Sequence, residues 1–187
     1  MSQNGQKQSL TNGWFPVGLG LHVSFGRTAS MSAAFLFNAV LESALSEVEA
    51  SGLPVFTFAM YHDHESGAVS VCADSEDSSA RCVASMNAYN AKHFGAAIAQ
   101  GDLKHAALWQ ANVGRSLSLG DFAIVNAART DIGDVPVDDR FYILMAQAVV
   151  AMQDRVAALA PRPDKLVFAC SGAAEEVALV WAMPAVA

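Results

Sequence analysis

The amino-acid sequence predicts an α+β protein, and three observations support this fold class. Two long stretches, 28–52 and 138–160, repeat apolar residues at spacings of three and four, which is typical of amphipathic helices. Short β-rich stretches bounded by turn-forming residues lie around them. The order strand, helix, strand, strand occurs twice. We therefore predict two βαββ repeats joined by a helical linker, in which long helices cover one face of a mixed or antiparallel sheet.

The first predicted half spans residues 14–77 and begins with a strand over 17–25. A helix follows, which Thr28 or Ser30 can cap at its start and Gly52 can end. Its predicted buried face consists of Phe37, Val40, Leu41, Ala44, Leu45 and Val48.

Two strands complete this half, over residues 55–61 and 68–72, and a hairpin-like loop over 62–67 joins them. The connector between the halves, 78–114, is predicted to be helical, with a cap at Ser78 or Ser79. Its predicted buried face consists of Val83, Met86, Phe94, Ala97 and Ile98.

The second half, 115–187, repeats the same order of segments. A strand is predicted over 122–125, followed by a helix that begins at Asp138 and two strands over 166–169 and 177–181. The predicted apolar stripe of the helix consists of Phe141, Leu144, Met145, Ala148, Val149, Met152, Val156 and Leu159. Pro161 and Pro163 are expected to end that helix.

Two short matches support an internal duplication. Residues 27–28 and 129–130 are both Arg-Thr, at an offset of 102, and a second register at an offset of 110 aligns Met60 with Cys170. We predict that the aligned residues occupy equivalent places. In segment order alone, the chain is similar to tandem strand–helix–strand–strand modules such as gyrase-inhibitor-like ligand-binding domains.

The composition narrows the class of partners. Hydrophobic residues make up 53% of the chain and charged residues only 16%, which favours a homo-oligomer, with a dimer preferred. The net charge is −7 and no run of Lys or Arg exists, so the sequence does not predict binding to nucleic acid.

The composition also predicts the cellular compartment of the protein and the disorder of its N-terminal residues. The three cysteines form no C-x-x-C pair, which favours a reducing compartment, the cytoplasm. No apolar stretch is long enough to cross a membrane. Residues 1–13 are rich in Gln, Asn and Ser and are predicted to be a disordered arm, with a single domain over 14–187.

A ligand site is predicted where strands end beside a helix N-terminus. The carboxyl ends of parallel strands meet at one edge, and the unpaired N–H groups of a helix start attract anions there. Arg27, Thr28, Arg129 and Thr130 are the candidate residues for a small anionic ligand. The alternative interpretation is a helix cap beside a solvated arginine.

The loop after the second strand could bind a divalent metal. His62, His64 and Glu65 lie within four positions, and the period of two places both imidazoles on one side of an extended chain. His22 could reach them from a neighbouring strand. The alternative is a polar turn, because Asp and His are common in turns.

Cys170 and Ser171 are interpreted as part of a structural turn with a buried thiol, because a nucleophile elbow needs a following helix.

The sequence therefore favours a small-molecule-binding or protein-interaction module with no evident catalytic motif. A metal-assisted hydrolase using the 62–65 loop and a structural or assembly protein are the alternatives. Whether the protein is an enzyme, and which cofactor it would use, is left open.

Overall fold

The computed structural model describes residues 32–183. The predicted disordered arm, the predicted strand over 17–25, and His22, Arg27 and Thr28 lie outside these residues. The strands are β1 (Thr57–Asp63), β2 (Ala68–Asp74), β3 (Ile124–Asp131), β4 (Val167–Cys170) and β5 (Leu179–Ala182). The helices are α1 (Ala33–Ser51), α2 (Glu76–Ala99), α3 (Leu103–Ala106) and α4 (Asp139–Ala157), with short 3-10 turns η1 (Leu119–Asp121) and η2 (Pro163–Lys165).

The five strands of the described chain form one mixed sheet in the order β3-β2-β1-β4-β5. β1 and β4 are parallel neighbours at its centre, and the other neighbouring pairs are antiparallel. The α+β class and the mixed sheet are therefore confirmed.

α1 ends and begins as its sequence dictates. Ser32 accepts a hydrogen bond from the Phe35 amide at 3.3 Å, and Gly52 closes the helix with a φ of 67°, a conformation that glycine adopts without steric cost. The cap lies two residues beyond the predicted Ser30. All six residues of the predicted apolar face are buried.

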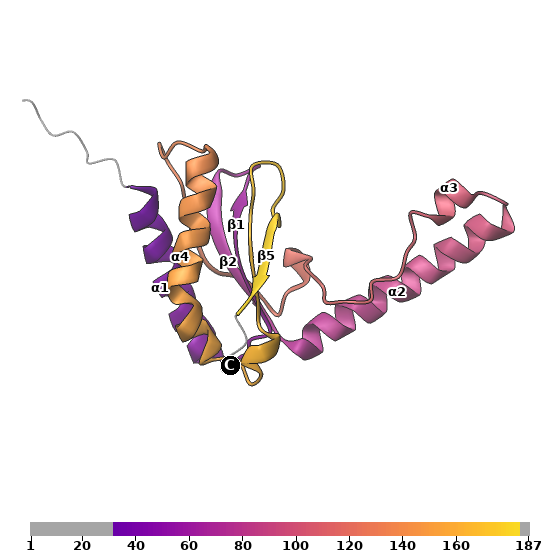
Figure 1. Ribbon diagram of the computed structural model, residues 1–187, viewed down its shortest axis with the longest axis horizontal. Coiled ribbons are helices and arrows are strands. Elements are labelled where there is room, and N and C mark those ends of the chain that lie inside the picture. Colours follow the sequence, from indigo (N-terminus) through magenta and orange to yellow (C-terminus); the bar gives the residue numbers. More distant parts are fainter. Residues whose placement is uncertain (1–31, 184–187) are drawn as a thin grey trace, which may run out of the picture.

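One face of the sheet is covered by α1 and α4, which lie side by side (Figure 1). Phe37 of α1 and Phe141 of α4 meet edge to face with ring centroids 5.0 Å apart. Phe58 and Phe168 from β1 and β4 lie in the same buried cluster. This helix-covered face forms the main core of the protein.

The central strand pair tests the predicted duplication. Phe58 pairs with Phe168 and Met60 with Cys170, which are the residues that the 110-residue offset aligns. However, β2 lies on one side of this pair and β5 on the other, while both helices cover the same face. The two helix–strand–strand units therefore have opposite hands, and no rotation superposes them. The structure does not confirm two βαββ repeats.

The segment between β2 and β3 departs most from the prediction. α2 begins at Glu76, with Ser75 as its cap, and runs away from the sheet (Figure 1). Between residues 80 and 115 only Ala97 and Ala106 are buried. The predicted buried face of the connector is wrong for Met86, Phe94 and Ile98, which are 40–46% exposed, whereas Ala97 is buried as predicted.

We call residues 81–118 the projection, and residues 32–80 together with 119–183 the body. No helix in the described part of the chain is both long and apolar enough to cross a membrane.

Candidate functional site

β1 and β4 end side by side, and this edge of the sheet brings together several predicted site residues. His62 is the sixth residue of β1, and Ser171 follows β4 directly. The Ser171 hydroxyl accepts a hydrogen bond from the His62 amide at 2.8 Å and donates one to the Glu176 carbonyl at 2.9 Å. The Ser171 hydroxyl therefore acts as both donor and acceptor, and the residue is fully buried, so this hydroxyl holds the two segments together.

His62 is the most enclosed ionisable group of this edge. Its ring lies 5.3 Å from the Phe141 ring between centroids, and only 5% of the residue is exposed. A hydrogen bond of 3.1 Å joins its Nδ1 to the Tyr142 hydroxyl, while Nε2 is buried and has no hydrogen-bond partner among residues 32–183. The first turn of α4 thus forms a lid of aromatic rings over the end of β1.

Burial lowers the pKa of His62, because the charged imidazolium loses its water, and the neighbouring His64 lowers it further. The two rings lie 4.5 Å apart between centroids. Asp63 partly opposes these effects. A neutral imidazole that accepts or donates at Nδ1 is the state this environment favours.

Asp63 points away from the two histidines and binds Arg129. Hydrogen bonds from the Ser66 hydroxyl and from Arg129 hold the pKa of the Asp63 carboxyl well below its usual range. The guanidinium Nη2 lies 3.0 Å from Oδ2 of Asp63 and also contacts the Ser66 hydroxyl. This ion pair fixes the hairpin between β1 and β2 against β3.

The predicted position of Arg129 and Thr130 is wrong. The strand predicted to end at residue 125 continues to Asp131, so both residues lie inside β3, opposite Ser70 and Val69 of β2. They do not stand at the start of α4, which follows only after residues 132–138. β3 is an edge strand, where alternating polar residues can face water, and the sequence pattern did not separate this strand from a loop.

Of the residues predicted to bind a metal, two histidines lie together, but the described residues do not complete a set of metal ligands. His62 and His64 lie on one side of the strand end, as the period of two predicts. Across residues 32–183, no group of three or more His, Cys, Asp or Glu side chains is arranged to hold a metal ion. Glu65 lies in the exposed turn, where its amide binds Asp63.

The turn after β4 begins at the buried thiol that the sequence predicts. Cys170 is buried, and its burial raises the pKa of the thiol to about 12. Gly172 allows the chain to pass close to the start of β5, because a Cβ at this position would lie 2.7 Å from the Cβ of Ala178.

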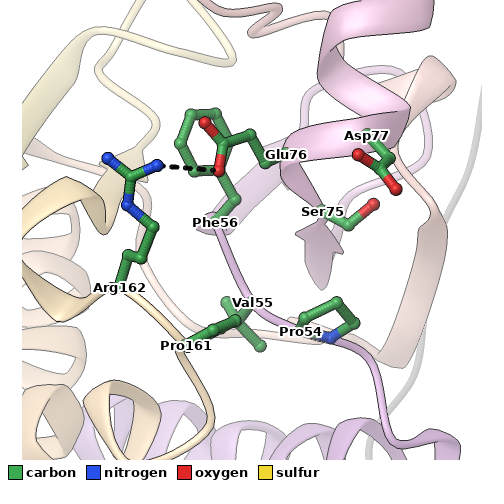
Figure 2. A pocket seen from close by; sticks show the side chains of 8 residues that line it. All are labelled: Pro54, Val55, Phe56, Ser75, Glu76, Asp77, Pro161 and Arg162. Carbon is green, nitrogen blue, oxygen red and sulfur yellow. Dashed lines mark ion pairs between the residues drawn. The ribbon is translucent and has the colours of Figure 1, made fainter.

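A cavity of about 200 Å³ lies where the projection leaves the body (Figure 2). Figure 2 shows Glu76 and Arg162 next to each other as an ion pair in its lining. Their charged atoms are 3.7 Å apart, and Lys165 also reaches Glu76 at 3.3 Å. The Glu76 carboxylate is thus paired with Arg162 and Lys165, while the exposed Asp77 in the lining forms no ion pair within residues 32–183. Its lining residues are Pro54, Val55, Phe56, Ser75, Glu76, Asp77, Pro161 and Arg162.

Arg115 attaches the returning end of the projection to the body. Its guanidinium donates to the carbonyls of Phe56 and Lys165, both at 2.7 Å, and to the Thr57 hydroxyl at 3.0 Å. Burial lowers the pKa of this guanidinium from its ordinary value. Arg115 therefore links the entry to β1 with the entry to β4.

Two asparagines hold the returning chain against α2. The Asn87 side chain donates to the Asn112 carbonyl at 2.9 Å and accepts from the Asn112 amide at 2.8 Å. The Asn90 amide group donates to the Gln110 carbonyl at 2.7 Å. These bonds satisfy backbone groups that no strand or helix pairs, which gives the projection a defined shape.

Aromatic residues gather toward the far end of the projection. The His93 ring stacks on Trp109 with centroids 4.7 Å apart, and Tyr89 and His105 contact the same indole ring. A groove of about 350 Å³ lies next to this cluster. Its lining residues are Asn87, Asn90, Ala91, Phe94, Trp109, Gln110 and Ala111.

The projection also carries much of the exposed apolar surface. Fourteen large apolar residues are exposed in the described chain, and seven of them lie on the projection. The projection makes up only about a quarter of residues 32–183. They are Met86, Tyr89, Phe94, Ile98, Leu103, Leu108 and Val113.

Comparisons of the chain with protein-family models, with curated proteins and with solved structures found no significant match.

Proposed function

We propose that the protein is a protein-interaction module whose docking element is the projection. The observation that carries this proposal is the exposure of large apolar side chains on a segment of defined shape. Single exposed apolar residues are common, but a contiguous group of them marks a binding surface. Leu103, Leu108 and Val113 of the projection are 73–99% exposed.

The energetics of α2 support the same function. An isolated helix gains little stability in water without an apolar face packed against a neighbour. Beyond residue 80, the 24-residue α2 packs against α3 and the returning chain, and near its base Cys82 contacts Asp121 of η1. A protein partner would bury this face and add the missing packing. The groove beside Phe94 and Trp109 could accept one side chain of that partner.

Small-molecule binding is less well supported. The cavity of Figure 2, at about 200 Å³, is smaller than the range of roughly 300–1,000 Å³ that is usual for ligand pockets, and the groove of about 350 Å³ beside Trp109 lies at the lower end of that range. The metal-assisted hydrolase remains a prediction for the His62–Glu65 loop, and metal analysis of the purified protein tests it.

The proposal of a protein-interaction module does not depend on an internal duplication. All three cysteines are free, which supports a reducing compartment such as the cytoplasm.

Photo-cross-linking tests the proposed docking element. Phe94→p-benzoylphenylalanine places a reactive group on the projection, and Val180→p-benzoylphenylalanine places it on β5 at similar exposure, 45% and 49% respectively. In cells that produce the full chain, irradiation should yield a defined protein–protein adduct from position 94 and little from position 180. Failure of position 94 and of a second projection position, Leu108, to form any adduct would contradict the proposal.

A further inference from the structure

The charges of the chain are divided unequally between the projection and the body. The projection has four Lys and Arg residues and one acidic residue, a net charge of +3. The described body has five Lys and Arg residues and seventeen acidic residues, a net charge of −12. Residues 32–80 contain eight Asp and Glu residues and no Lys or Arg. A basic, apolar segment thus extends from an acidic body.

From this complementarity we infer that the partner of the projection is a second copy of this chain, and that the projection docks on the acidic body of that copy. The inference rests on the proposed function and names its partner. Complementary charges guide association and fix which surfaces meet, while buried apolar area supplies most of the affinity.

Other partners fit the charges less well. The acidic body would repel nucleic acid or an anionic membrane that approached the projection. Two projections that met each other would bring like charges together, with the exposed Lys92 and Lys104 on each. Only the contact of a projection with a body pairs opposite charges on both sides.

α1 is the receiving surface that we assign. Its outward side carries three glutamates, no basic residue, and Phe35 at 62% exposure. Glu42 is already paired with Arg155 at 2.6 Å. Glu47 and Glu49 are exposed and form no ion pair within residues 32–183, so they are available to Lys92 and Lys104 of the other copy.

The length of the projection allows a closed dimer. A helix of 24 residues is about 36 Å long, which is comparable with the diameter of a small domain. If each projection reaches the body of the other copy, the two contacts are identical and related by a two-fold axis. Such an arrangement closes on itself and stops at two copies.

Sedimentation equilibrium of the purified full chain gives the first test. The expected species has twice the 19.7 kDa mass of one chain. Leu103→Ser with Leu108→Ser removes apolar surface that is 73–74% exposed, so folding should be unaffected and dimer affinity should fall at least tenfold. The matched control, Val125→Ser with Val180→Ser on the edge strands, should dimerise as the unmodified chain does. Circular dichroism checks that each variant is folded.

A charge exchange tests which surfaces meet. Lys92→Glu with Lys104→Glu should weaken self-association at least tenfold, and so should Glu47→Lys with Glu49→Lys. Mixing these two double variants should restore dimers, because each projection then faces a body of opposite charge. A chain that remains monomeric at every concentration, or a mixture that does not dimerise, would overturn the inference. If the chain is monomeric and position 94 cross-links to a different protein, the inference falls and the proposed function stands.

Discussion

The guanidinium carbon of Arg115 lies 3.8 Å from the centre of the Phe56 ring. A cation in this position is attracted to the face of the ring, and the same group also donates three hydrogen bonds. Arg115 is therefore the main contact through which the returning end of the projection is attached to the sheet.

Replacement of Arg115 by Ala should destabilise the protein by about 2–3 kcal/mol, because buried acceptors lose a charged donor. Arg115→Lys should recover only part of this loss, since an ammonium cannot reproduce the planar fork of donors. Urea unfolding measures the effect. Arg81→Ala, at an exposed position in α2, should change stability by no more than about 0.5 kcal/mol. Equal losses at both positions would show that Arg115 is not an anchor.

Gly172→Ala should destabilise the turn between β4 and β5 by about 1–3 kcal/mol, because the added Cβ would overlap the Cβ of Ala178. Adding Ala178→Gly removes the overlapping atom and should recover part of the loss. Gly120→Ala is a suitable control, since no atom of the described residues lies within 4 Å of a Cβ at that position. Thermal unfolding of the four proteins compares them, and an unchanged midpoint for Gly172→Ala would contradict this account of the turn.

The stability of the protein should depend on pH through His62. Its pKa is lower in the folded chain than the ordinary value of 6.5, so the unfolded chain takes up a proton first as the pH falls. The free energy of unfolding should therefore have its full value above about pH 6.5 and decrease as the pH falls toward the pKa of the folded state. Asp63 should add a separate loss of stability only below the ordinary carboxyl pKa of 3.8.

His62→Gln tests this dependence, because glutamine keeps a polar group near the Tyr142 hydroxyl and does not titrate. Denaturant unfolding between about pH 5 and 7 should show a shallower pH slope for this variant. His105→Gln, at an exposed position on the projection, should keep the slope of the unmodified protein. A slope that is unchanged by His62→Gln would assign the pH dependence to other groups.

The sequence predicts the body of the protein well where one periodicity dominates. The buried face of α1, the cap of α4 at Asp138 and the hairpin between β1 and β2 follow from apolar spacing and turn residues. Asp138 accepts from the Phe141 amide at 3.0 Å, as a helix cap should. These features depend on residues close together in the chain.

The features that failed depend on contacts between distant segments. The apolar residues of α2 have helical spacing, but spacing cannot say whether a helix packs on its own body or projects from it. The apolar pattern of the sequence also could not predict the order of strands around β1 and β4. The opposite hands of the two halves follow from that order, so they could not be predicted either. The pairing of His62 with Tyr142 was missed because these residues are 80 positions apart. The change from acidic to basic charge at residue 81 was the available signal for the projection.

The attachment of the projection at one end has a mechanical consequence. α2 joins the body at its cap, Ser75, and the chain returns to it at Arg115, so the projection is attached to the body at one end. Over an arm of about 36 Å, a rotation of about 10° at the base displaces the tip by about 6 Å. A small change in the Arg115 contacts would thus be amplified at Leu103. The residues that attach the projection at its base therefore also determine the range of positions that its tip can occupy when it meets a partner.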